Sequence, residues 1–120
     1  MKKKTVVIGA SDNPERYAYK ATVLLAQKSH IVIPVGLRKG KIGTIEIQQD
    51  RSFIKEVDTV TLYVGPSNQP NWYDYILSLK PKRIIFNPGT ENEAFELLAE
   101  SHNIHVVRAC TLVLLSTGQY

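Results

Sequence analysis

Short apolar runs alternate with amphipathic segments along the whole chain. The runs are rich in β-branched residues, which predicts strands, and the segments between them carry apolar residues at helical spacing. We expect five strands, at residues 5–9, 31–35, 58–64, 82–86 and 104–108. We expect helices at residues 15–29, 51–56, 68–79, 91–102 and 110–117.

Proline and glycine refine this pattern after the second strand. Pro34 lacks the N–H that a central ladder needs, so we expect the second strand to end there. Residues 36–50 contain three glycines and predict a loop, with a short extended piece near residues 44–47.

The regular alternation of strands and helices with short connections predicts a parallel sheet. We therefore expect an α/β fold: a three-layer sandwich with a mostly parallel five-stranded sheet and helices on both faces. A chain of 120 residues, 43% of them hydrophobic, has the size and composition of one domain, so we expect a single unit over residues 1–120. Ligands of such folds bind at the carboxyl ends of the strands, which makes the candidate site loops residues 9–14, 34–41, 63–67 and 87–91.

The first of these loops has the sequence GASDNP. Gly9 allows a tight turn, the small residues after it keep the loop slim, and the amides of the following helix suit a phosphate. The dinucleotide fingerprint G-x-G-x-x-G would place glycines where Ser11 and Pro14 stand. An ordinary tight turn, with Asp12 or Asn13 capping the helix, is the alternative interpretation.

The end of the second strand carries basic residues and no acidic one. An NAD-binding domain usually places Asp or Glu here to hold the ribose hydroxyls, and residues 34–39 contain neither. Arg38, Lys39 and Lys41 can instead meet a phosphate on the ribose. This favours an adenosine with an extra phosphate, as in NADP or coenzyme A (CoA), over NAD, whereas a solvated basic loop is the alternative.

The loops after the third and fourth strands offer close approach to a ligand and little charge. The sequence YVGPS, which starts at Tyr63, supplies an apolar wall with free backbone groups. Gly89 permits a positive φ or a close contact. Thr90 and Glu93 would form a capping box if Thr90 caps the next helix.

The net charge of +4 comes largely from basic clusters at residues 2–4 and 38–41. The first cluster predicts a solvated tail, and no recognition-helix or RNA-binding signature accompanies the charge, which argues against nucleic acid as a partner. The single cysteine and the absence of a signal peptide indicate a reducing cytoplasm. No apolar run is long enough to span a membrane, so we expect no membrane partner.

The sequence contains no catalytic or metal-binding pattern. Cys110 follows the last strand, where it is either a structural residue or close enough to the thiol of CoA for a mixed disulfide. The aromatic cluster at residues 72–75 predicts packing, with a partner surface as the alternative. The histidines show no metal-ligand spacing and lie outside the expected site loops: His30, His102 and His105.

Seven segments of the chain, taken in order, carry a family resemblance. They are VVIGAS, NPERYAYKA, HIVIPVG, GKIG, DTVTLYVGP, FNPGTENEA and IHVVRACTLVLL, which together cover nearly the whole chain. This ordered set resembles the single-domain CoA-binding proteins, the CoA-binding domain family. That family shares its Rossmann-like fold with the N-terminal domain of the succinyl-CoA synthetase α subunit.

The resemblance implies that a CoA nucleotide lies across the first loop and the end of the second strand. The pyrophosphate would face the first loop with Lys20 as a phosphate partner, the adenosine would lie at the second-strand end, and residues 87–89 would face the pantetheine arm. The candidate cofactor contacts are Gly9, Ala10, Ser11, Asn13, Tyr19, Lys20, Pro34, Val35, Gly36, Arg38, Tyr63, Val64, Pro66, Asn87, Pro88 and Gly89.

We therefore expect a small-molecule nucleotide ligand, CoA or an acyl-CoA, bound by a domain that catalyses no reaction itself. The synthetase reaction is not implied, because it needs a second domain with a phosphorylated histidine and a partner subunit. A carrier, sensor or regulator is expected, and a protein partner is left open. The alternatives are an NADP-binding oxidoreductase or its remnant, and a protein-interaction module that has lost its ligand.

Overall fold

The computed structural model describes residues 2–120 and confirms an α/β fold built on one parallel sheet. The sheet has the strand order β2-β1-β5-β6-β7, and all neighbouring strands are parallel. From β1 the chain first adds β2 on one side and then returns to add β5 on the other side, so the strand order reverses between β1 and β5. Ligands of doubly wound sheets bind outside the strand ends at such a point. The strands are β1 (Thr5–Ile8), β2 (Val32–Val35), β5 (Thr59–Leu62), β6 (Arg83–Phe86) and β7 (His105–Arg108).

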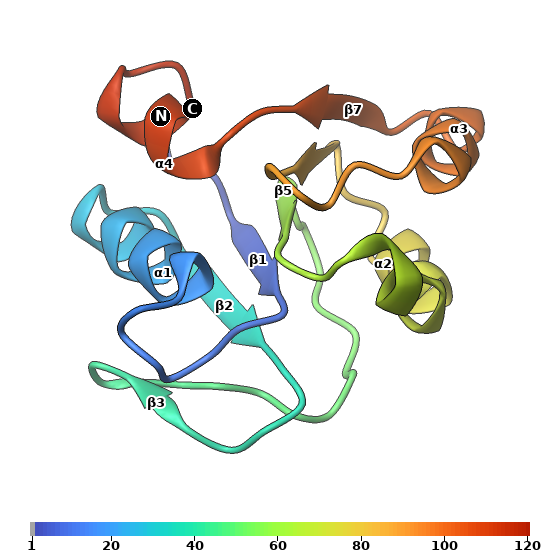
Figure 1. Ribbon diagram of the computed structural model, residues 1–120. Helices are drawn as coiled ribbons and strands as arrows, with labels where there is room; N and C mark the ends of the chain where they lie inside the picture. The colour runs from blue at the N-terminus through green and yellow to red at the C-terminus, as the bar shows by residue number, and fades with distance from the viewer. Residues whose placement is uncertain (1) are drawn as a thin grey trace.

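Helices cover both faces of the sheet, which confirms the three-layer, Rossmann-like arrangement (Figure 1). On one face lie α1 (Tyr17–Gln27) and α4 (Thr111–Ser116), which contact each other. On the other face lie α2 (Tyr73–Ser78) and α3 (Glu93–Ser101). None of the helices in residues 2–120 combines the length and the apolar character needed to cross a membrane.

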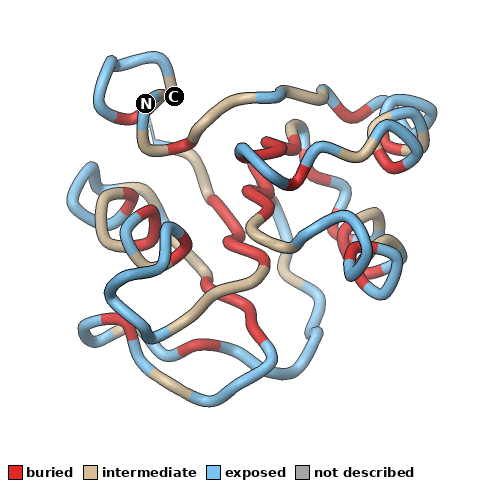
Figure 2. The backbone as a smooth tube through the Cα atoms, viewed as in Figure 1, coloured by how far each residue is buried: buried red, intermediate tan, exposed pale blue. Residues whose placement is uncertain are grey.

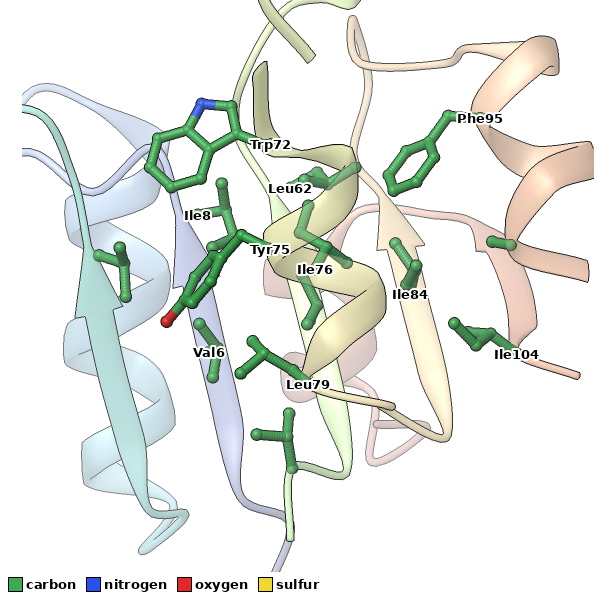
Figure 3. Packing of buried hydrophobic residues seen from close by; sticks show 14 of the residues in the cluster. Val6, Ile8, Leu62, Trp72, Tyr75, Ile76, Leu79, Ile84, Phe95 and Ile104 are labelled. Carbon is green, nitrogen blue, oxygen red and sulfur yellow. The ribbon is translucent and has the colours of Figure 1, made fainter. Parts of the chain in front are cut away.

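The core lies on both sides of the strands, because successive side chains of a strand point to opposite faces. In β1, Ile8 packs in a cluster with Trp72 on the α2 side, whereas Val7 packs in a cluster with Ala18 and Leu25 on the α1 side. Figure 3 shows the first cluster, and Figure 2 shows buried residues along the strands with exposed outer helix surfaces. Burial on both faces is why the strands appear in the sequence as continuous apolar runs.

The second strand does not end at Pro34, contrary to the sequence prediction. β2 continues to Val35, and Pro34 pairs in register with Val7 of β1. The carbonyl of Pro34 accepts the N–H of Gln48 at 2.9 Å, on the side of β2 away from β1. The missing N–H faces the same outer edge, so proline breaks no bond to β1.

The segment between β2 and β5 differs most from the sequence prediction. The predicted helix at residues 51–56 is wrong, because this segment has no helical structure. It is held by tertiary contacts instead: the Tyr75 hydroxyl donates to the Ser52 carbonyl at 2.9 Å, and Lys4 donates to the Lys55 carbonyl at 2.8 Å. The expected extended piece is a small antiparallel hairpin of β3 (Lys41–Ile42) and β4 (Ile45–Glu46).

The predicted helix at residues 68–79 forms as two pieces. A 3₁₀ helix, η1 (Pro66–Trp72), leads directly into α2. Pro70 lies inside η1, and its missing N–H and fixed φ favour the short 3₁₀ form over a regular α-helix.

The capping box expected from Thr90 and Glu93 is also wrong. Asn92 is the N-cap of α3, and its side-chain oxygen accepts the N–H of Phe95 at 3.2 Å. The hydroxyl of Thr90 is buried and donates to the Asn87 carbonyl at 2.8 Å, so it stabilises the turn before the helix.

Candidate nucleotide-binding cleft

A cleft of about 770 Å³ opens at the carboxyl ends of β1, β2 and β5. Its volume lies in the range typical of small-molecule and cofactor sites. It lies at the point where the strand order reverses, as expected for a doubly wound sheet. The lining comes from the turn after β1 and the start of α1 (residues 9–13 and 16–18), from the segments beside β2 (residues 37–39, 47 and 51) and from the region after β5 (residues 63–65, 68, 71 and 72).

Two glycines allow the turn after β1 to approach the neighbouring strands. Gly9 has a φ of +89°, and a Cβ atom there would lie 2.8 Å from the carbonyl oxygen of Tyr63. A Cβ atom on Gly36 would lie 2.6 Å from the carbonyl oxygen of Ala10. The amides of Gly9 and Ala10 both donate to the Val35 carbonyl at 3.0 Å. The turn is therefore held tightly between β2 and β5, and a side chain at either glycine would displace it.

The backbone amides after this turn are free to donate to a ligand. Within residues 2–120, the N–H groups of Ser11 and Asp12 and those of residues 17–19, at the start of α1, have no hydrogen-bond acceptor. The predicted cap by Asp12 or Asn13 is wrong, because α1 begins at Tyr17 and has no side-chain cap. The side-chain oxygen of Asn13 accepts the amide of Glu15 at 3.0 Å, which lies before the helix. Uncapped amides at a helix start favour a bound anion.

The cleft carries more positive than negative charge. Arg16, Arg38, Lys39 and Arg51 line it, with Asp12 as the only acidic lining residue. The ion pairs in the part of the chain that the structure describes join Lys41 to Glu46 and Arg108 to Glu96, so none of the four lining cations is paired. A concave site with this charge attracts phosphate-bearing ligands.

Arg51 and Trp72 form a stacked pair at the cleft. The Arg51 guanidinium carbon lies 3.7 Å from the centroid of the indole ring, and the guanidinium donates to the carbonyl of Asn71. Trp72 is 3% exposed, because its other side packs in the core and Arg51 covers the side that faces the cleft. Neither residue is among the contacts predicted from the sequence.

Tyr63 lines the cleft through a ring that is partly in the core. Its hydroxyl group is buried near those of Thr61 and Thr111 and makes no hydrogen bond with any residue from 2 to 120. Burial raises the pKa of the Tyr63 phenol far above its ordinary value, and the neighbouring hydroxyls offset this only in part. The phenol is therefore neutral and is no candidate for a general base at physiological pH.

Part of the predicted site comes together in the cleft. The predicted contacts that line it come from three separate loops: Gly9, Ala10, Ser11, Asn13, Arg38, Tyr63 and Val64.

Other predicted contacts lie outside the cleft. Tyr19 and Lys20 line a second depression of about 440 Å³ between α1 and α4, and the Lys20 ammonium lies 5.4 Å from the Tyr17 ring centroid. Pro34, Val35 and Gly36 are buried behind the lining and meet it through their backbone.

The fourth loop does not reach the cleft lining. Pro88 and Gly89 of this loop are exposed outside the cleft, as is Pro66 at the end of the third loop. Asn87 is buried and connects β5 to α4: its side chain donates to Thr61 Oγ1 at 2.6 Å and accepts the amide of Thr111 at 2.9 Å. In this structure Asn87 stabilises the junction of these elements.

Several lining residues were not in the predicted set. Some of them belong to segments that were predicted to be helical. The sequence therefore gave no reason to place them in a site formed by loops. Arg51 and Ile47 reach the cleft through the irregular path of residues 47–51, which only the tertiary structure defines. The lining residues outside the predicted contacts are Asp12, Arg16, Tyr17, Ala18, Leu37, Lys39, Ile47, Arg51, Gly65, Asn68, Asn71 and Trp72.

No cluster of three or more His, Cys, Asp or Glu side chains suitable for a metal ion occurs in residues 2–120. Cys110 is half-buried at the start of α4 and is not part of the cleft lining.

Comparison with known proteins identifies the family. Residues 3–116 match the CoA binding domain, so the chain belongs to the CoA binding domain family. A search of curated proteins found no match.

Solved structures support the same fold. A crystal structure described as that of an uncharacterized protein is 50% identical to this chain, with a TM-score of 0.98, and covers 100% of this chain and 99% of its own. A hypothetical protein from Pyrococcus horikoshii OT3 is 20% identical with a TM-score of 0.87 over 97% of this chain and 83% of its own. A Thermus thermophilus protein, cell-free ID.343, is 22% identical with a TM-score of 0.84 over 98% of this chain and 91% of its own.

Proposed function

We propose that this protein binds CoA or an acyl-CoA in the cleft at the carboxyl ends of β1, β2 and β5, as a carrier, sensor or regulator without catalysis of its own. Membership of the CoA binding domain family supports the ligand class. The observation that carries the proposal is the combination of free amides at the turn after β1 with four unpaired cations around the same cleft.

The diphosphate of CoA is assigned to the amides of Ser11 and Asp12 and the first amides of α1. These donors are fixed by the turn that Gly9 and Gly36 make possible, so the site is formed before a ligand binds. The hydroxyl of Ser11 accepts the amide of Asn13 at 3.1 Å, which leaves its own proton available to a phosphate oxygen.

The adenosine is assigned to the side of the cleft next to β2. Val35 is fully buried, so its side chain cannot stack on a base, but Leu37 and Ile47 line the cleft at this side. Arg38 and Lys39 are exposed beside them. The carboxylate of Asp12 also reaches this side from the turn after β1, since a Cβ atom on Gly40 would lie 2.7 Å from Asp12 Oδ2. The loop that follows β2 carries no acid of its own at residues 36–41, which disfavours the ribose recognition used by NAD-binding domains.

The proposal of a non-catalytic role rests on the chemistry of the lining. Its ionisable side chains are Asp12, the four cations, Tyr17 and Tyr63, and the histidines and Cys110 lie elsewhere. None of the lining groups forms a hydrogen-bonded nucleophile–base pair in residues 2–120. We place the protein in a reducing cytoplasm, where its single cysteine stays a thiol.

Isothermal titration calorimetry with CoA, acetyl-CoA, NADP, NAD and ATP tests the ligand assignment. We expect CoA and acetyl-CoA to bind in the micromolar range or tighter, and a ligand at 100 times its Kd stabilises the protein by about 2.7 kcal/mol. Binding of NADP without CoA would favour an oxidoreductase or its remnant, which shares the acid-free strand end. Absence of binding by every nucleotide would favour the protein-interaction module.

A further inference from the structure

Anion-binding groups reach the cleft from both faces of the sheet, at the carboxyl end of β1. The turn after β1 leads into α1, which packs with Val7 on one face. Trp72 packs with Ile8 on the opposite face, beyond the carboxyl end of β1 (Figure 3). Arg51, stacked on Trp72, therefore lies across the end of β1 from the turn that is assigned to the diphosphate.

Arg51 is held in place more firmly than the other cations of the cleft. Its guanidinium is stacked at 3.7 Å on the indole and donates to the Asn71 carbonyl. Among residues 2–120 Arg51 has no carboxylate partner, and it is an exposed residue of the cleft lining, so it has N–H groups left for a ligand. Arg38 and Lys39 make no side-chain hydrogen bond within the described residues. A guanidinium that is already oriented loses less conformational entropy when it binds an anion.

We propose that Arg51 on Trp72 forms a second phosphate subsite, which binds a phosphate group separate from the diphosphate at the turn. This inference rests on the proposed function. CoA carries its negative charge in two places, the diphosphate and the 3′-phosphate of the ribose. With the diphosphate at the amides of Ser11 and Asp12, the 3′-phosphate is the group left for a second fixed cation. Arg51 thus makes the cleft selective for CoA over dephospho-CoA, which lacks that phosphate.

Paired titrations of CoA and dephospho-CoA test the subsite in the wild-type protein, in R51Q and in R51K. We expect R51Q to lower the affinity for CoA by roughly 10- to 150-fold, toward that of dephospho-CoA, and to leave the affinity for dephospho-CoA within about twofold of wild type. R51K keeps the charge but loses the planar stack and the paired N–H groups, so it should recover only part of the selectivity. R38Q is the matched control and should lower both affinities by a similar, smaller factor.

Trp72 supplies a direct readout, because it is the only tryptophan of the chain. CoA bound at Arg51 should change the emission of Trp72 at saturation, and dephospho-CoA should change it less. Unfolding curves of ligand-free R51Q show whether the variant is folded. A folded R51Q that loses affinity for both ligands equally, or keeps the wild-type selectivity, overturns the subsite. A selective loss in R38Q instead would also overturn it by assigning the 3′-phosphate to Arg38. If neither ligand binds the wild-type protein, the proposed function itself fails.

Discussion

Cations gather at both ends of the sheet, and the structure uses them differently at each end. At the amino end, Lys2, Lys3 and Lys4 donate to the backbone carbonyls of Lys28, Tyr120 and Lys55, at 3.2, 2.7 and 2.8 Å. At the carboxyl end, the side chains of Arg16, Arg38 and Lys39 have no hydrogen-bond acceptor within residues 2–120.

The comparison shows that a count of positive charges does not locate a binding site. The sequence predicted a solvated tail at residues 2–4. Lys2 is exposed, but all three lysines donate to carbonyl groups of distant segments. A cation that donates to carbonyl groups away from the cleft stabilises the fold, whereas a cation that lines the cleft without a carboxylate partner is available to an anionic ligand.

The largest expected effect on stability lies at the amino end, at Arg83. Its side chain donates to Thr59 Oγ1 at 3.0 Å and to the Tyr120 carbonyl at 2.9 Å, and its guanidinium carbon lies 4.5 Å from the Tyr120 ring centroid. We expect Arg83→Ala to lower the free energy of unfolding by about 2–3 kcal/mol in urea titrations, with CoA affinity unchanged. Arg108→Ala, which removes the ion pair between a half-exposed arginine and Glu96, is the control and should cost less. Equal losses in the two variants would contradict this role of Arg83.

At the carboxyl end, the expected effect is on both stability and binding. The Cβ of Gly36→Ala would lie 2.6 Å from the Ala10 carbonyl, so the phosphate turn must move. We expect a loss of about 1–3 kcal/mol of stability and at least a tenfold loss of CoA affinity, measured by urea unfolding and calorimetry. Gly65→Ala meets nothing within 4 Å and should change the stability by less than about 0.5 kcal/mol. Full CoA affinity in Gly36→Ala would show that the position of the turn does not govern binding.

Lys20 tests whether a cation outside the cleft contributes to binding. The family resemblance makes it a phosphate partner, but it lies beside the cleft and is not part of the lining. Its ammonium lies over the Tyr17 ring at 5.4 Å, outside the cleft. We expect Lys20→Ala to lower CoA affinity by no more than about threefold, as a change in long-range attraction. A loss comparable with that of R51Q would instead mean that Lys20 rotates into the site and contacts the ligand.

The smallest expected effect is a pH dependence at the amino end. His30 Nδ1 accepts the amide of Lys3 at 2.9 Å, and burial, together with the charge of Lys2, lowers the pKa of His30 below its ordinary value of 6.5. The imidazole of His30 therefore takes up its proton at a higher pH in the unfolded chain than in the folded protein. The stability that neutral His30 contributes is complete above pH 6.5 and is lost as the pH falls through the folded-state pKa. Urea unfolding should show that the free energy of unfolding decreases less between about pH 7.5 and 5.5 in His30→Gln than in the wild-type protein. Identical pH dependence would exclude His30 as its source.

The sequence predicted much of the fold because its signals were local. Five apolar runs gave five strands, with ends within two residues of those observed, and the glycine at the end of the first run indicated the turn at which the cleft lies. The absence of an acid after the second strand is likewise readable from the sequence. These features follow from side-chain periodicity and from the conformations that glycine permits.

What the sequence could not determine depends on contacts between distant segments. Residues 51–56 looked helical by local pattern, yet tertiary contacts such as that of Ser52 with Tyr75 hold them in an irregular path. That path is what stacks Arg51 on Trp72, 21 positions further along the chain, at 3.7 Å. Thus the sequence by itself determined the sheet, the turn after β1 and the acid-free strand end. Only the tertiary structure decided which cations are satisfied by the fold and which are left free to bind a ligand, because hydrogen-bond satisfaction depends on groups that the chain brings together only on folding.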